Sequence, residues 1–146
     1  MDIKIKDKKW IGVLILILTI AVIWGQSCLP PEGSSAESGW VKEILQKVLG
    51  LIFGKVEVSE MLVRKMGHFT EYLILGAELT AFFPTLKTAI IPMLGFGTAF
   101  LDETIQIFSG RGPQIQDVWI DLAGVLVGMA VMLLIRKWRE KAKTTK

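Results

Sequence analysis

The chain has 146 residues, 51% of them hydrophobic, and its mean hydropathy is +0.49. This is too apolar for an ordinary soluble domain, and the apolar residues fall in long blocks, so we expect an integral membrane protein. The net charge is +3, and no basic patch is interleaved with aromatic residues, which argues against nucleic acid as a partner. The single cysteine excludes an intrachain disulfide and a cysteine-rich metal site.

The first apolar segment covers residues 10–26, follows a cluster of lysines and contains no charged residue. Its length is close to the roughly 20 residues that cross a bilayer, which predicts a transmembrane helix. The alternative is a cleaved signal peptide or a lipoprotein site near Ser27 and Cys28. Gly25 stands where a lipoprotein site requires a larger aliphatic residue, and more apolar segments follow, so we favour a retained helix.

The next stretch changes character twice. Prolines, a glycine and serines between residues 27 and 38 predict a flexible polar loop. Residues 39–53 then repeat apolar side chains at helical spacing, with Lys42 and Lys47 on the opposite face. This amphipathic helix is too short and too charged to cross a bilayer. It lies in the membrane interface or packs on the other helices, and the sequence does not choose between the two.

Three further apolar segments predict transmembrane helices at residues 63–83, 87–108 and 117–135. Gly124 and Gly128 form a small-xxx-small face in the last one, which favours close helix packing. The predicted fold is all-α: one domain, an integral membrane bundle of four transmembrane helices plus one amphipathic interfacial helix.

The basic residues predict the orientation of this bundle. Both ends of the chain are rich in lysine and arginine, and an even number of spans puts both ends on one side. The positive-inside rule then predicts a multi-pass plasma-membrane protein with both termini cytoplasmic. The loops at residues 26–62 and 109–116 face outward in this arrangement.

This topology brings polar side chains from three predicted helices to one depth, just beneath the outer surface. The residues at this depth are His68 and Glu71, then Asp102, Glu103 and Gln106, then Asp117 and Asp121. At roughly 100° per residue, one face of each helix joins polar to small or apolar residues. These faces carry Arg64, His68 and Glu71 in the first helix, Asp102 and Gln106 in the second, and Asp117 and Asp121 in the third. Glu78 lies about 15 Å deeper than His68 by helix rise, so we expect it to be protonated or paired inside the bundle.

Several chemical roles fit these residues. The carboxylates could form ion pairs with Arg64 and Arg111 that only hold the bundle together. His68 and the carboxylates could bind a divalent cation, or His68 could act as a general base. The two arginines could hold a phosphate or a peptide carboxylate. No HExxH, nucleophile elbow or Gly-rich phosphate loop occurs, so we expect no cofactor, and no specific motif supports a metal.

Two separated blocks of sequence carry a family resemblance. One block reads Arg64-Lys65-Met66-Gly67-His68-Phe69-Thr70-Glu71-Tyr72, followed by Leu75-Gly76, and the other contains Asp102-Glu103, Gln106, Arg111 and Asp117, with Gly124 downstream. At this spacing they resemble the VanZ-like family, from about residue 10 to the end of the last predicted helix. Gln114 stands where family members often carry Ser or Thr, and Asp121 where they often carry Asn. If these side chains touch a ligand, the ligand or its affinity differs here.

The resemblance implies a small bacterial plasma-membrane protein whose founding member is linked to low-level resistance to teicoplanin, a lipoglycopeptide. We therefore expect either a protein that protects against lipoglycopeptides, or a membrane enzyme that acts on a lipid-linked or cell-wall substrate at the outer leaflet. A purely structural role for the polar residues is the third hypothesis. The expected partners are membrane lipids and a lipid-linked cell-wall component or a lipoglycopeptide, and the oligomeric state is left open. The predicted functional residues, called the polar cluster below, are Arg64, His68, Glu71, Tyr72, Asp102, Glu103, Gln106, Arg111, Asp117 and Asp121.

Overall fold

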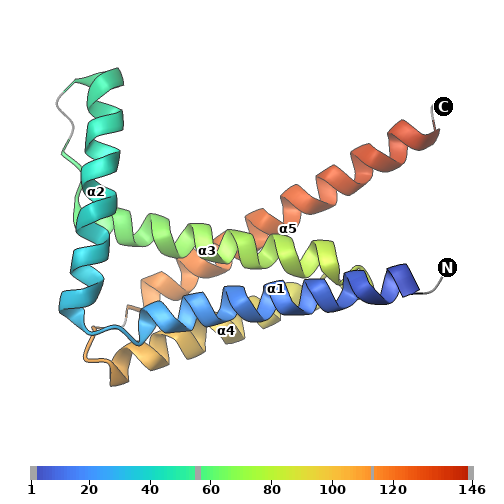
Figure 1. Cartoon of the computed structure of the whole chain (residues 1–146), viewed down its shortest axis with the longest axis horizontal. Coiled ribbons are helices and arrows are strands. Elements are labelled where there is room, and N and C mark those ends of the chain that lie inside the picture. The colour runs from blue at the N-terminus through green and yellow to red at the C-terminus, as the bar shows by residue number, and fades with distance from the viewer. Residues whose placement is uncertain (1–2, 55–56, 113, 145–146) are drawn as a thin grey trace.

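The computed structural model describes residues 3–54, 57–112 and 114–144, and these residues form five α-helices and no strand. The all-α fold class is therefore confirmed. Four helices run along the long axis of the molecule, and α2 crosses one end of them (Figure 1). The start of α1 and the end of α5 both lie at the other end. The helices are α1 (Ile3–Ser27), α2 (Pro31–Phe53), α3 (Glu60–Phe82), α4 (Ile90–Phe108) and α5 (Ile115–Thr144).

The helix bounds differ from the sequence-based expectation at several places: α1 already begins at Ile3, α3 and α4 are shifted by about three residues at their starts, and α2 and α5 are longer than expected. The prediction of a flexible loop up to residue 38 was wrong, because α2 already begins at Pro31. A proline at the first helical position has its φ preset for a helix, and Glu32 in the first turn interacts well with the helix dipole. The last helix continues past residue 135 to Thr144, with basic side chains in its last turn, which the same dipole favours.

The closest helix pair is α3 and α5, and glycines set its spacing. A β-carbon at Gly124 would lie 2.5 Å from the carbonyl oxygen of Phe69, and one at Gly128 would collide with the carbonyl oxygen of Leu73. On the other side of the contact, a β-carbon at Gly76 would collide with the backbone of Val125. The predicted close packing at residues 124–128 is thus present, since only glycine lets the two backbones approach this far.

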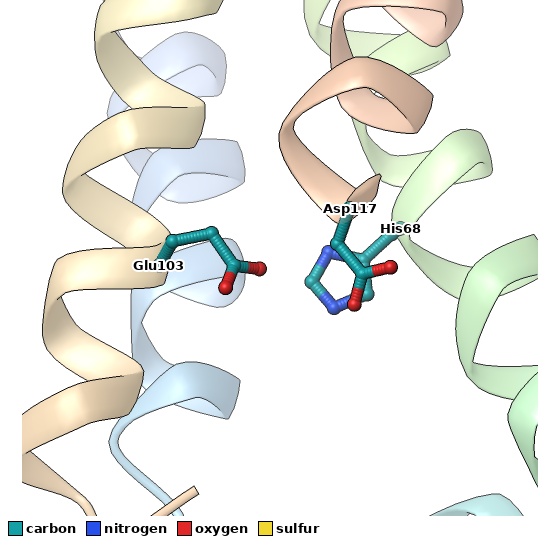
Figure 2. A group of neighbouring side chains, drawn as sticks. All are labelled: His68, Glu103 and Asp117. Carbon is teal, nitrogen blue, oxygen red and sulfur yellow. The ribbon is translucent and has the colours of Figure 1, made fainter. Parts of the chain in front are cut away.

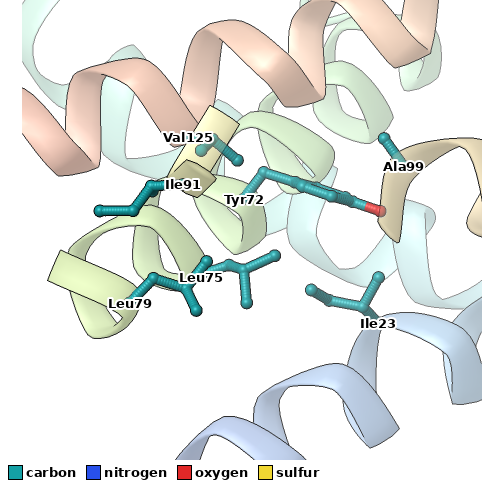
Figure 3. Close-up of a cluster of buried hydrophobic side chains, with 7 residues drawn as sticks. All are labelled: Ile23, Tyr72, Leu75, Leu79, Ile91, Ala99 and Val125. Atoms are coloured by element: carbon teal, nitrogen blue, oxygen red, sulfur yellow. The ribbon is translucent and has the colours of Figure 1, made fainter. Parts of the chain in front are cut away.

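The buried apolar core is small. Figure 3 shows it between α1, α3, α4 and α5, and its members are Ile23, Tyr72, Leu75, Leu79, Ile91, Ala99 and Val125. Many large apolar side chains are exposed instead, such as Leu14 on α1 at 58% and Met93 on α4 at 71%. An apolar surface of this extent is unusual for a protein in water and is typical of a surface that contacts another apolar phase.

Within the described residues, two helices are long and apolar enough to cross a membrane. The stretches are Trp10–Ser27 in α1 and Ile115–Thr144, which is α5. Helices α3 and α4 carry most of the ionisable residues of the polar cluster, and these residues lower the mean hydropathy of the two helices below that of a membrane-crossing segment.

Candidate functional site

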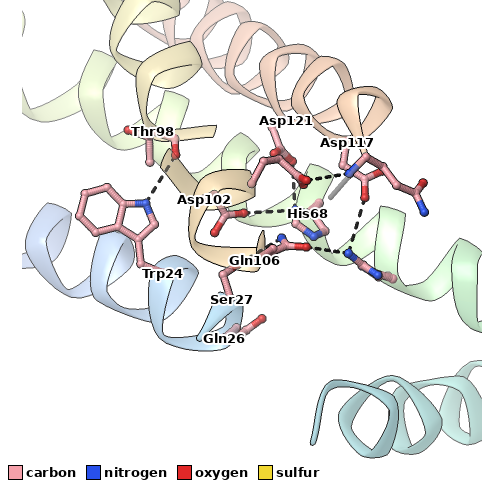
Figure 4. Close-up of polar contacts among 12 residues, drawn as sticks. Trp24, Gln26, Ser27, His68, Thr98, Asp102, Gln106, Asp117 and Asp121 are labelled. Carbon is pink, nitrogen blue, oxygen red and sulfur yellow. Dashed lines mark hydrogen bonds and ion pairs between the residues drawn. The ribbon is translucent and has the colours of Figure 1, made fainter. Parts of the chain in front are cut away.

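The structure brings the polar cluster together at the end of the bundle that α2 crosses. Its members project from α3, α4, the loop between α4 and α5, and α5 (Figure 4). The polar faces predicted for these three helices therefore point toward one another. Most are buried, whereas Arg64 and Glu71 are partly exposed. The buried members are His68, Tyr72, Asp102, Glu103, Gln106, Arg111, Asp117 and Asp121.

His68 forms the centre of the innermost contacts. Its Nδ1 atom lies 3.3 Å from Oδ1 of Asp121 on α5 and 3.7 Å from Oδ2 of Asp102 on α4 (Figure 4). Asp102 also interacts with the side chain of Ser27 and with the charge of Arg111. Three helices therefore place one imidazole between two buried carboxylates.

Asp117, in the first turn of α5, has a different environment. Lys65 Nζ lies 3.1 Å from its Oδ1, and Arg64 Nη2 lies 3.9 Å from its Oδ2. Arg64 also donates a hydrogen bond of 2.7 Å to Oε1 of Gln106. The ion-pair interpretation thus applies to Asp117, whose charge faces two basic side chains and the favourable end of the α5 dipole.

Glu103 on α4 points toward His68 and Asp117 across the space between the helices (Figure 2). Its Oε2 accepts a hydrogen bond of 2.8 Å from the backbone N–H of Gln114, and its Oε1 accepts none from the described residues. Ligand atoms of His68, Glu103 and Asp117 all lie within 4.8 Å of one another, and the same holds for His68, Asp102 and Asp121. Two groups of potential metal ligands therefore share His68.

The end of α1 also contacts the site, although the predicted polar cluster contains no residue of this helix. Arg111 Nη1 donates to the carbonyl of Gln26 at 3.1 Å, and the hydroxyl of Ser109 donates to the carbonyl of Ser27 at 2.8 Å. Gln106 Nε2 also donates to the Ser27 hydroxyl at 3.3 Å. The last carbonyls of a helix lack partners in the helix itself, so these bonds fix α1 to the loop between α4 and α5.

Gln26, Ser27 and Lys65 are thus additional residues of the site region. One signal for the first two was available in the sequence, because they are the first polar residues after a long uncharged run and lie at the predicted outer end. Lys65 has no such signal, since a basic residue near a membrane interface is more often an anchor than an ion-pair partner.

The remaining acidic and phenolic groups lie at the margins. Tyr72 is fully buried in the apolar core, and its hydroxyl has no hydrogen-bond partner among the described residues. Glu78 accepts a hydrogen bond of 2.9 Å from the hydroxyl of Thr19 on α1, which agrees with the expected pairing inside the bundle.

Two adjoining cavities open beside the polar cluster. The apolar pocket, of about 650 Å³, is lined by α1, α2 and α3 with side chains such as Trp40 and Leu45, and its polar end contains His68 and Glu71. The second cavity, of about 340 Å³, is lined by three basic residues, Arg64, Lys65 and Arg111, by two acidic ones, Glu60 and Asp117, and by the loop after α4, and it is called the basic pocket below. Arg64 and Arg111 line both pockets, so the two arginines stand at their boundary.

Comparison with known proteins gives the family. The model of the VanZ/LLP1 family matches residues 12–136, which is most of the chain. The chain belongs to the VanZ-like family. This VanZ-like chain is also 26% identical, over 97 residues, to "Uncharacterized membrane protein YwnJ" of Bacillus subtilis (strain 168), which covers 66% of the chain and 68% of that relative. No solved structure matches it. Family membership, this relative and the two apolar helices together make it a membrane protein of the VanZ-like type.

Proposed function

We propose that this VanZ-like protein binds an anionic, lipid-linked component of the cell envelope at the outer leaflet of the plasma membrane. Through this binding it lowers susceptibility to lipoglycopeptides such as teicoplanin. The observation that carries the proposal is that the apolar pocket and the basic pocket share two arginines, Arg64 and Arg111, in their linings. An amphiphile with an acyl or prenyl chain and a phosphate matches this pair of environments.

The proposed topology is the predicted one, in which α1, α3, α4 and α5 cross the membrane and both termini are cytoplasmic. Support comes from the ionisable side chains of α3 and α4, many of which turn into the bundle while apolar side chains such as Phe100 face outward. Helix α2 then lies in the outer interface. It crosses the end of the bundle and exposes apolar side chains such as Trp40 and Leu51, which suits an interfacial helix.

The size and charge of the pockets support a ligand of this class. Pockets for small ligands usually enclose about 300–1,000 Å³ and are mostly apolar with a few polar groups, which describes the apolar pocket. A guanidinium binds phosphate oxygens through two parallel charge-assisted hydrogen bonds, and these are stronger where water is scarce. Arg64 is already held in place by Gln106, so little side-chain entropy is lost when a ligand binds.

Lipid binding by the purified full-length protein in nanodiscs tests the proposal. We expect it to bind a polyprenyl phosphate more tightly than phosphatidylcholine. We expect Arg64→Gln to weaken phosphate binding at least about tenfold, which corresponds to the loss of one charge-assisted contact. Lys137→Gln, at the other end of the bundle, is the matched control and leaves binding unchanged. Equal binding of the two lipids by the wild-type protein would refute the proposal.

Susceptibility measurements test the physiological part. Deletion of the gene is expected to increase sensitivity to teicoplanin, and a plasmid that encodes the wild-type protein restores resistance. The Arg64→Gln variant, produced at the same level in membranes, does not restore it. Unchanged sensitivity to both teicoplanin and vancomycin after deletion would remove the resistance role and leave lipid binding to be judged separately.

A second candidate function is a membrane enzyme that acts on a lipid-linked substrate through the His-carboxylate-Arg cluster. The observation in its favour is the 3.3 Å distance between His68 Nδ1 and Asp121 Oδ1, because a carboxylate in this position orients an imidazole as a general base beside the apolar pocket. An enzyme would release a water-soluble product from a headgroup-labelled lipid. His68→Ala and Glu103→Gln would abolish that release while the folded protein persists in membranes. Full release by both variants would exclude this function.

A further inference from the structure

We propose that His68, Asp102 and Asp121 bind one divalent cation of the first transition series, such as Zn²⁺ or Mn²⁺, at the inner end of the polar cluster. The cation site rests on these three side chains alone. It does not require a lipid in the neighbouring pockets, so it goes beyond the proposed function.

The geometry of the three side chains suits a shared ion. Their ligand atoms come from three different helices and lie within 4.8 Å of one another. His68 Nδ1 is 3.3 Å from Asp121 Oδ1 and 3.7 Å from Asp102 Oδ2. Two ligands of a tetrahedral zinc ion, each about 2.0–2.1 Å from the metal, lie roughly 3.4 Å apart. The two separations from His68 are close to this value, and the two aspartates offer oxygens within 4.8 Å of each other.

The charge balance points the same way. Asp102 and Asp121 are fully buried, and a carboxylate oxygen of each lies within 4 Å of the imidazole of His68. Two buried carboxylates side by side are strongly unfavourable unless their charges are compensated. One protonated imidazole compensates one of the two charges, and the guanidinium of Arg111 acts on Asp102 as well. A divalent cation bound by a neutral His68 compensates both.

The donor set selects the class of cation. Mg²⁺ and Ca²⁺ take oxygen ligands, whereas an imidazole nitrogen together with carboxylate oxygens suits zinc, manganese or iron. The chain has a single cysteine, Cys28, which is exposed and is in neither group of potential ligands. A cation that requires several thiolate ligands therefore does not fit this site.

The other group of potential ligands, with His68, Glu103 and Asp117, is less suited. Asp117 already faces Lys65 at 3.1 Å, and a cation beside it would be repelled by that ammonium group. Glu103 already uses Oε2 for the backbone of Gln114. Its Oε1 accepts no hydrogen bond from the described residues, and its carboxylate points toward His68 (Figure 2), so Glu103 is the side chain placed to act as an additional ligand.

Titration of the purified protein in detergent tests the site. The full chain is treated with EDTA and titrated with Zn²⁺, Mn²⁺ or Mg²⁺ in a calorimeter. We expect one equivalent of Zn²⁺ or Mn²⁺ per chain and much weaker binding of Mg²⁺. Asp121→Asn and Asp102→Asn are each expected to weaken binding at least about 100-fold, since loss of even an outer-shell partner costs 10- to 100-fold. Glu78→Gln changes a partly buried carboxylate elsewhere on α3 and leaves the affinity unchanged.

Two further measurements keep the result decisive if an aspartate variant fails to fold. A saturating concentration of Zn²⁺ is expected to raise the unfolding temperature of the wild-type protein, because the ion binds the folded state. X-ray absorption of the zinc-loaded protein is expected to show nitrogen and oxygen ligands only. No stoichiometric binding, wild-type affinity in the folded aspartate variants, no shift in unfolding temperature, or a sulfur ligand from Cys28 would each overturn the proposal. Because no lipid is added, these outcomes are independent of the lipid-binding result.

Discussion

Gly128 on α5 lies directly against the carbonyl oxygen of Leu73 on α3, where any β-carbon would collide with that oxygen. The contact sets the spacing of the two helices that carry Asp121 and His68. The distance of 3.3 Å between those two side chains therefore depends on a glycine two turns of helix away.

Replacement of Gly128 by alanine is expected to lower the stability of the protein by about 1–3 kcal/mol, because the added methyl group overpacks the contact between the two backbones. Gly97→Ala on α4 is the matched control. A β-carbon there meets nothing within 4 Å, so alanine should be neutral or stabilise the helix by up to about 1 kcal/mol. Thermal unfolding in detergent measures both, and equal stability of the two variants would contradict the close approach of α3 and α5.

The ion pair between Lys65 and Asp117 is expected to contribute measurably to stability. Asp117 is almost fully buried, so Asp117→Asn leaves two basic side chains facing a neutral group and should cost about 1–3 kcal/mol. The exposed pair of Lys42 and Glu60, at 3.6 Å, is the comparison, and Lys42→Gln should change stability by less than about 0.5 kcal/mol. Chemical denaturation in mixed micelles gives both values. The prediction fails if Lys42→Gln is the more damaging change.

The hydrogen bond from Thr19 to Glu78 joins α1 to α3 away from the polar cluster. Thr19→Val keeps the shape of the side chain but leaves Oε1 of Glu78 without its donor, which should cost about 1–3 kcal/mol. Thr19→Ser retains the hydroxyl and should stay within about 1 kcal/mol of the wild-type protein. If valine and serine behave alike in thermal unfolding, the hydroxyl contributes nothing to the helix contact.

Cys28 provides a test of the proposed topology. It is the single cysteine of the chain, is exposed, and lies at the end of α1 beside the site. A membrane-impermeant maleimide is expected to label it in intact cells. In a Cys28→Ser background, a cysteine introduced by Lys143→Cys should be labelled only after the membrane is permeabilised. Labelling of that position in intact cells would place the end of α5 outside and reverse the orientation.

Much of the fold was predictable because the signals for it are local. Uninterrupted apolar runs and helical periodicity predicted all five helices, and the glycines at 124 and 128 predicted a close contact. The helix bounds were predicted less accurately. The stretch before residue 39 has the serine and proline content of a loop, but from Pro31 onward it forms the first turns of α2. Most of the polar cluster was also predictable as a group of neighbours, because depth along each helix and position on its face follow from residue numbers alone. Tyr72, which the family resemblance added, lies in the apolar core instead.

The pairing within that set required the tertiary structure. Asp117 and Asp121 are one turn apart on the same face of α5, and their spacing does not say which side chain each one faces. Packing places Asp117 beside Lys65 and Asp121 beside His68, so that one carboxylate is neutralised by a basic side chain and the other is buried against an imidazole. Residue periodicity determines which side of a helix is polar. Only the distance and rotation of the neighbouring helix, set here by backbone contact at glycines, decide which charges meet.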